Sequence, residues 1–237
     1  MLFYHSLLFT NAVQLNDPFD CHPALIDFSN VPKEICRNWF PEVVALAEAD
    51  RFKKNREKAW LCSLSRVYDS MLMWSYYSKH KGVCVGLDME KTRKFMPQIL
   101  DSIGGCQEWD VQYVDVVEKP NYFSDMKDFF RYQMTTKAKV WEHEQEVRLF
   151  SYDPSPKYMR LMPRHDDETD TSPLKDVRAI FEITPDCFKS LYLGVSMKKK
   201  KRAEIVEVAR KCNPAIKIYQ MTIDPDAFRL KAVLLND

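Results

Sequence analysis

The feature that most constrains the fold of this sequence is a series of short apolar runs, interspersed irregularly with longer segments that have apolar residues at helical spacing. Short runs rich in Val, Ile, Leu and aromatic residues are typical of β-strands. The expected strands cover residues 7–9, 59–65, 82–88, 109–117, 140–150, 157–162, 177–183, 190–196, 215–223 and 228–235. The expected helices cover residues 33–59, with a break at Pro41, and residues 68–80, 88–100, 124–138 and 198–212. Because strands and helices do not alternate strictly, we predict an α+β fold: a single domain over residues 1–237 with a central twisted, mostly antiparallel or mixed sheet flanked by helices.

The sequence predicts five further details of the fold. The run at 82–88 is almost continuously apolar, which indicates a buried strand. Residues 157–162 are expected to pair with residues 140–150, and residues 215–223 with 228–235 as a hairpin. The polar, proline-bounded stretch 163–173 is expected to be a mobile loop. Asp69 or Ser70 is expected to cap the helix at 68–80.

Composition excludes several classes of protein. Hydrophobic residues make up 46% of the chain, enough for a sizeable core, and 35 Lys and Arg nearly balance 34 Asp and Glu. The nearly balanced charge therefore gives no overall electrostatic attraction to nucleic acid or to a membrane surface. The two common glycine-rich nucleotide motifs are absent, and no apolar stretch approaches the ~20 residues of a membrane span. The seven cysteines include no Cys-x-x-Cys pair, which predicts a reducing, cytoplasmic location and argues against a zinc ribbon.

In the segment VWEHEQEVRLF, residues 140–150, charged residues occupy every second position from Glu144 to Arg148. If it is a strand, Glu144, Glu146 and Arg148 share one face, with the Cα atoms of the two glutamates roughly 6.5–7 Å apart. One carboxylate could then contact a reacting carbon while the other reaches a second reactant, and Arg148 would keep a carboxylate ionised. The alternative is an ion-pair lattice on a solvated sheet face.

The segment before the apolar run at 82–88 is rich in aromatic residues: Trp74, Tyr76 and Tyr77, followed by His80. Aromatic side chains beside polar groups can hold a planar ring, so these residues are candidate ligand contacts. The alternative is ordinary core packing for the aromatic stripe, with His80 placed near the helix C-terminus by the macrodipole.

The turn NDPFD, residues 16–20, contains Asp17 and Asp20. Two acids in a turn could bind a metal through oxygen, but Asn and Asp more commonly fix such turns through their own backbone. We therefore predict no metal site, and keep a metal-dependent nucleic-acid hydrolase built from Asp17, Asp20, Glu144 and Glu146 as the weakest of three functional hypotheses.

Three segments together resemble a prokaryotic family called Domain of Unknown Function 2971. They are Asn16–Asp20, the Met73-Trp74-Ser75 helix that leads to Tyr77, His80 and Gly82, and Trp141 with Glu144, Glu146 and Arg148. The resemblance runs from about residue 7 to the end of the chain. Other members usually begin with a further strand, for which the FYHS segment with His5 is expected to stand in. The alternative is that the chain lacks this part of the site and is a non-catalytic member.

A looser resemblance concerns activity. A Glu-x-Glu strand late in an α+β domain is similar to the catalytic strand of ADP-ribosyltransferases. It implies that Glu146 steadies the ribosyl oxocarbenium formed from NAD and that Glu144 engages the acceptor. It also implies that Tyr76 or Tyr77 stacks on nicotinamide and that His5 grips NAD.

Two principal functional hypotheses follow. The first is an NAD-consuming transferase or glycohydrolase with no resident cofactor, whose small-molecule partner is a nucleotide. Arg148, Trp74, Trp141 and His80 complete its predicted binding residues. The second is a non-catalytic binding module, for example in phage defence or stress response, in which Trp74, Trp141, Glu144 and Arg148 form a buried polar brace.

Overall fold

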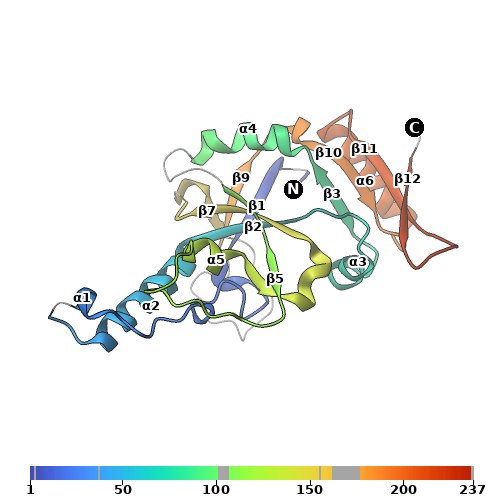
Figure 1. The fold of residues 1–237 in the computed structure, drawn as a ribbon. Helices are drawn as coiled ribbons and strands as arrows, with labels where there is room; N and C mark the ends of the chain where they lie inside the picture. Colours follow the sequence, from blue (N-terminus) through green and yellow to red (C-terminus); the bar gives the residue numbers. More distant parts are fainter. Residues whose placement is uncertain (3, 37, 101–106, 155, 162–176, 236–237) are drawn as a thin grey trace.

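The structure is a computed structural model that describes residues 1–2, 4–36, 38–100, 107–154, 156–161 and 177–235 (Figure 1). It has the predicted α+β fold. The α-helices are α1 (Lys33–Cys36), α2 (Pro41–Lys58), α3 (Met71–Ser78), α4 (Met89–Leu100), α5 (Phe129–Thr135) and α6 (Lys199–Cys212). Among the described helices, none combines the length and the hydrophobicity that crossing a membrane requires. Figure 1 shows α1 and α2 extending away from the sheets.

Most strands belong to two larger sheets. The first has the order β4 (Gln107–Asp110), β7 (Glu146–Tyr152), β2 (Ala59–Ser65), β1 (Ser6–Asn11), β9 (Val177–Glu182) and β8 (Met159–Leu161), with antiparallel neighbours. The second has the order β12 (Leu230–Leu234), β11 (Lys217–Ile223), β10 (Phe188–Leu193) and β3 (Val83–Leu87). In the second sheet β10 and β11 are parallel and the other neighbours antiparallel. The short strands β5 (Gln112–Val114) and β6 (Thr136–Ala138) form a parallel pair. The predicted mostly antiparallel, mixed arrangement is confirmed.

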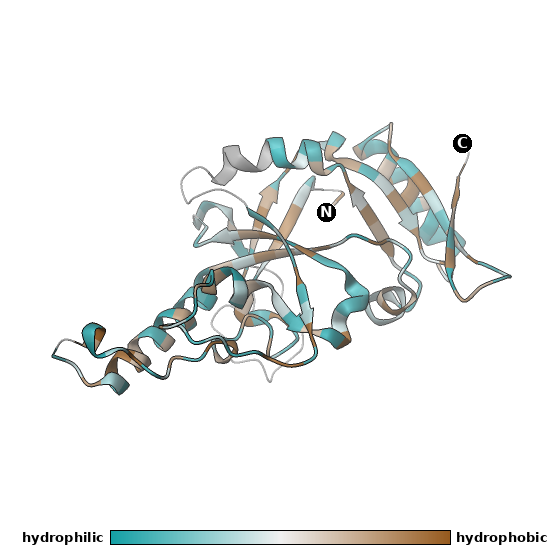
Figure 2. Cartoon of the chain, viewed as in Figure 1, coloured by the Kyte–Doolittle hydropathy of each residue, from teal (hydrophilic) through white to brown (hydrophobic). Residues whose placement is uncertain are grey.

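The first sheet is covered on both faces, which is why β7 is buried along almost its whole length. On one face Leu149 belongs to a core cluster that includes Leu191 and Ile218 of the second sheet. On the other face Phe150 packs with Met134 of α5 and with Cys21. Because side chains two apart on a strand share a face, Glu146 and Arg148 point toward α5, as Phe150 does. Figure 2 shows hydrophobic residues along β3 and hydrophilic residues along much of α6.

Local sequence signals set several helix boundaries. Pro41 is the first residue of α2, where its missing N–H and fixed φ are compatible with a helix start. Ser70 caps α3 and accepts a hydrogen bond from Met73 N, as the sequence predicts.

The short helix α5 depends on its cap, since its seven residues are too few for a stable isolated helix. Asp128 Oδ1 accepts a hydrogen bond from Arg131 N at 3.0 Å. We expect Asp128→Ala to lower the free energy of unfolding by about 1 kcal/mol, the usual loss for an N-cap. Urea denaturation measures this, and Asp128→Asn should retain most of the stability because an amide oxygen can also accept the bond.

Three predicted elements differ from the structure around this helix and β3. The helix expected over 124–138 is confined to α5, because residues 136–138 leave the helix to pair with β5. The strand expected over 109–117 is two strands, β4 paired with β7 and β5 paired with β6, and residues 115–117 belong to neither. The run at 82–88 forms β3 but is not fully buried, because β3 is the edge of its sheet.

The segment at 157–162 was expected to pair with residues 140–150, and that expectation is wrong. Its strand β8 pairs with β9 instead, at the opposite edge of the sheet from β4 and β7. The predicted hairpin of β11 and β12 is confirmed. The stretch 163–173, expected to be a loop, lies outside the described residues.

Candidate functional site

Five charged side chains from four segments meet beneath α5. They are Asp20 in the turn after β1, Lys137 on β6, Glu144 at the end of the 3-10 helix η3 (Lys139–Glu144), and Glu146 and Arg148 on β7. We call these five residues the charge cluster. All five are buried. With three carboxylates and two cations, the cluster has a formal charge of −1.

Arg148 is the centre of the cluster, with none of its side chain exposed. Nε donates to Glu146 Oε1 at 2.8 Å, and Nη2 donates to Glu146 Oε2 at 3.1 Å and to Asp20 Oδ2 at 2.7 Å. Nη1 donates to Asp20 Oδ1 at 2.8 Å and to the Met134 carbonyl at 2.6 Å. Nη1 also lies 3.2 Å from Cys21 Sγ. The five contacts with oxygen alone equal the number of N–H groups of the guanidinium. Arg148 therefore positions two carboxylates and has no donor left for a phosphate.

Lys137 joins the two glutamates. Its Nζ lies 2.5 Å from Glu144 Oε2, 2.8 Å from Glu146 Oε2 and 3.8 Å from Asp20 Oδ2. The same ammonium lies 5.3 Å from the ring centroid of Trp141, within cation–π distance.

Two tyrosines complete the polar contacts. Tyr77 of α3 donates its hydroxyl hydrogen to Glu144 Oε1 at 2.6 Å. The hydroxyl oxygen of Tyr113 on β5 accepts a hydrogen bond from Glu146 N at 2.8 Å. Burial, followed by the contact with Glu144, raises the pKa of Tyr77 to about 12, so this hydroxyl keeps its proton at neutral pH.

The protonation states of the cluster follow from its charges. Burial alone would raise the pKa of Glu146, but Arg148 and Lys137 outweigh it and lower that pKa to about 2. Burial likewise opposes the charged forms of Lys137 and Arg148, and the surrounding anions raise the pKa of each above its usual value. Glu146, Lys137 and Arg148 are therefore all charged at neutral pH.

A cavity of about 280 Å³ lies beside the cluster. Asp20, Lys137, Glu144, Glu146 and Tyr77 line it together with Leu15, Asn16, Ser63, Leu64, Ser65 and Met73. A second cavity of about 350 Å³ also has Ser65, Met73 and Tyr77 in its wall, so the two adjoin. A cavity of about 180 Å³, on β5 and β6, is also lined by Asp20 and Lys137. The charge cluster is thus buried in the fold but not sealed on every side.

The structure unites only some of the predicted site residues. Glu144, Glu146 and Arg148 belong to the charge cluster, Tyr77 and Trp141 contact it, and Trp74 lines the adjoining cavity. The indole N–H of Trp74 donates to Tyr68 O at 2.8 Å, and its ring packs in a core with Met221 and Leu230.

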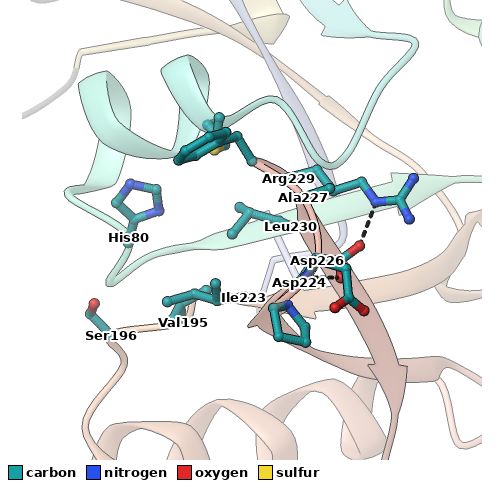
Figure 3. A pocket seen from close by; sticks show the side chains of 12 residues that line it. His80, Val195, Ser196, Ile223, Asp224, Asp226, Ala227, Arg229 and Leu230 are labelled. Atoms are coloured by element: carbon teal, nitrogen blue, oxygen red, sulfur yellow. Dashed lines mark hydrogen bonds and ion pairs between the residues drawn. The ribbon is translucent and has the colours of Figure 1, made fainter.

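The other predicted binding residues lie elsewhere. Tyr76 is 65% exposed, with its ring 6.0 Å from that of His143. His5 precedes β1, and its carbonyl accepts a hydrogen bond from Ile183 N. His80 lines a different cavity, of about 630 Å³, at the turn between β11 and β12 (Figure 3). None of these three lines the cavity beside the cluster.

The segment 140–150 is not one strand, which corrects the geometry inferred from the sequence. Residues 139–144 form η3, Gln145 has a left-handed φ of 43°, and β7 begins at Glu146. Ser65 Oγ donates to Glu144 O at 2.7 Å, just where the pairing of β2 with β7 ends. Glu146 and Arg148 share a strand face as predicted, but Glu144 reaches the same place from another element.

Sequence reasoning missed Lys137 and Tyr113. Lys137 fell within an expected helix, and Tyr113 was one of several aromatic residues in an expected strand. The signal available for Lys137 was the β-branched Thr136 beside it, since such residues favour strands.

The acidic residues proposed above as metal ligands are already engaged in hydrogen bonds and ion pairs within the protein. Asp17 Oδ1 accepts from Phe19 N at 2.9 Å and fixes the turn, whereas Asp20 and Glu146 are held by Arg148. In the part of the chain that the structure describes, no three His, Cys, Asp or Glu residues are grouped as metal ligands would be. These residues do not fit a metal ion.

Comparison with known proteins gives one match. Residues 73–149 match the model of a family described as a protein of unknown function, DUF2971. Neither the curated proteins nor the solved structures contain a match. The matched residues run from α3 to β7 and include Tyr77, Lys137, Glu144, Glu146 and Arg148, but not Asp20. Over this segment, the chain is similar to the DUF2971 family.

Proposed function

We propose that the charge cluster and its cavity form the active site of an NAD-consuming enzyme, either an ADP-ribosyltransferase or an NAD glycohydrolase. The observation that carries this proposal is a cavity bordered by two buried glutamates within a cluster of formal charge −1. Departure of nicotinamide leaves positive charge on the ribose, and negative charge fixed beside that position stabilises such a state.

The contacts of the two glutamates support different roles. Both oxygens of Glu146 are held by cations, and its low pKa keeps it ionised, so it supplies the fixed negative charge. Glu144 Oε1 is held by the neutral hydroxyl of Tyr77, a weaker contact that an incoming group can replace. Glu144 therefore suits the role of engaging the acceptor, which is a water molecule in a glycohydrolase.

The size of the cavity supports partial enclosure of the ligand. The space beside the glutamates and the adjoining cavity share a wall at Ser65, Met73 and Tyr77. Together they fall within the ~300–1,000 Å³ typical of small-molecule sites. Tyr77 lines both cavities, where its ring can contact a planar base.

The proposal is tested by adding NAD to the purified protein and measuring its melting temperature and the release of nicotinamide. NAD at a hundred times its dissociation constant should stabilise the fold by about 2.7 kcal/mol. Glu146→Gln and Glu144→Gln should each reduce nicotinamide release about a hundredfold, the loss expected when one preorganised electrostatic contact is removed. Glu142→Gln is the matched control, because Glu142 is an exposed acid on the same 3-10 helix. Absence of both thermal stabilisation and nicotinamide release would rule the proposal out.

The complete use of the N–H groups of Arg148 supports a second candidate, the non-catalytic binding module. In that case the charge cluster serves only to hold α5, β6 and β7 together. A partner surface is available on the α1–α2 arm, where Trp39 and Phe40 are 67% and 76% exposed. This candidate predicts no response to NAD, together with loss of partner binding in Trp39→Ala but not in Glu144→Gln.

A further inference from the structure

Among the residues that the structure describes, no strand pairs with the outer side of β12, so β12 is an edge of the second sheet. It is the last strand in the order β12-β11-β10-β3, and Figure 1 shows it at the margin of the molecule. Natural edge strands are usually protected by proline, bulges or outward charges. The strand LKAVL has no proline, and its one charge, Lys231, is drawn back to Asp224 at 2.8 Å. Its edge is therefore available for pairing.

The register with β11 shows which backbone groups face outward. Asp224 N donates to Arg229 O and Leu235 N donates to Ile218 O, so residues 229 and 235 form hydrogen-bonded pairs with β11. Hydrogen-bonded and non-bonded pairs alternate in an antiparallel ladder, so Lys231 and Val233 also bond to β11. The N–H and C=O groups of Leu230, Ala232 and Leu234 consequently point away from β11, toward the open edge.

We propose that this edge pairs with β12 of a second copy of the chain, antiparallel, about a twofold axis at Ala232. In that register Ala232 faces its own counterpart, and Leu230 faces Leu234 of the second copy on either side. Every outward-facing residue then meets another outward-facing residue, and each such pair exchanges two hydrogen bonds. The interface is isologous, and it joins the two four-stranded sheets into one.

The side chains are complementary in the same register. Leu230 and Leu234 form apolar cross-strand pairs on the face that contacts Trp74 and Met221. On the opposite face Lys231 lies across from Val233 of the second copy, so no like charges meet. Val233 and Leu234 are 51% and 49% exposed in one chain, and the pairing covers them. Because the edge complements itself in its hydrogen bonds and side chains, a second copy is the occupant that it fits.

Two substitutions at one exposed position test the register. Val233→Glu places an acid opposite Lys231 of the second copy, and Val233→Lys places a like charge there. Each contact occurs twice per dimer, and cross-strand pairs contribute roughly 0.2–1 kcal/mol each. Sedimentation velocity over a concentration series should therefore show the dimer dissociation constant falling about 2- to 30-fold for Val233→Glu and rising by a similar factor for Val233→Lys.

Ala232→Pro provides an independent test. Proline at this position removes the outward N–H at the twofold axis without removing a hydrogen bond to β11, so a folded monomer is expected. Circular dichroism checks that each variant is folded. A wild-type protein that stays monomeric at all concentrations would overturn the proposal. So would Val233→Glu and Val233→Lys shifting the dissociation constant in the same direction, or a folded Ala232→Pro that dimerises like the wild type. None of these measurements depends on NAD.

Discussion

Replacing Arg148 with leucine is expected to lower the free energy of unfolding by about 3–5 kcal/mol, the range for removing one partner of a buried ion pair. Arg148 holds both oxygens of Asp20 and both oxygens of Glu146. Without it, two buried carboxylates have only Lys137 as a counter-charge, and Met134 O loses a donor. Urea denaturation followed by tryptophan fluorescence measures the change.

The matched control is Arg66→Leu. Arg66 also contacts an aspartate through two nitrogens, but its side chain and that of Asp110 are more than half exposed. An exposed pair contributes about 0–1 kcal/mol, so the control should be nearly as stable as the wild type. Equal, small losses for both variants would show that Arg148 is not a principal stabilising contact.

Acid should destabilise the protein by about 3 kcal/mol through Glu146 alone. The pKa of this carboxyl falls from 4.5 to about 2 in the folded state, and one unit corresponds to about 1.4 kcal/mol. A lowered folded-state pKa contributes stability that is complete above the unfolded value and is lost as the pH falls toward the folded value. The loss attributable to Glu146 should therefore fall between about pH 4.5 and pH 2.

Glu146→Gln isolates this effect. The variant should be less stable at neutral pH, because an amide is a weaker partner for Arg148 and Lys137. Its stability should also change less between pH 4.5 and pH 2 than that of the wild type. Equilibrium urea unfolding at several pH values gives the free energy of unfolding of each protein as a function of pH. If this free energy changed equally with pH in the two proteins, the lowered pKa of Glu146 would be contradicted.

Local elements could be predicted from the sequence where the local signal is strong. The strand at 59–65, the helix break at Pro41 and the Ser70 cap all depend on side chains acting on their own backbone. The pairing of strands that are distant in the sequence was harder to predict. Residues 157–162 have a strand pattern, but nothing within the segment distinguishes β9 from β7 as its neighbour.

The candidate site was predicted in part. The alternation of Glu146 and Arg148 correctly placed them on one strand face, because that inference needs only the period of a strand. Glu144 joins them through a left-handed residue, Gln145, and a non-glycine residue rarely adopts this conformation, so the sequence gives no sign of it. Lys137 was missed because the helix was expected to continue to residue 138, whereas α5 ends at Thr135.

The distance in sequence between Asp20 and Arg148 determines when the charge cluster can form during folding. It bonds Arg148 across 128 positions of the chain, from outside the segment that matches the DUF2971 family. Contacts so remote in sequence must overcome a large loop-closure entropy, so they form only once the intervening chain is largely organised. An excised fragment of residues 73–149 would carry an arginine with half of its counter-ions missing. The integrity of the charge cluster is accordingly a property of the completed chain, and its formation during refolding should report the last stage of assembly.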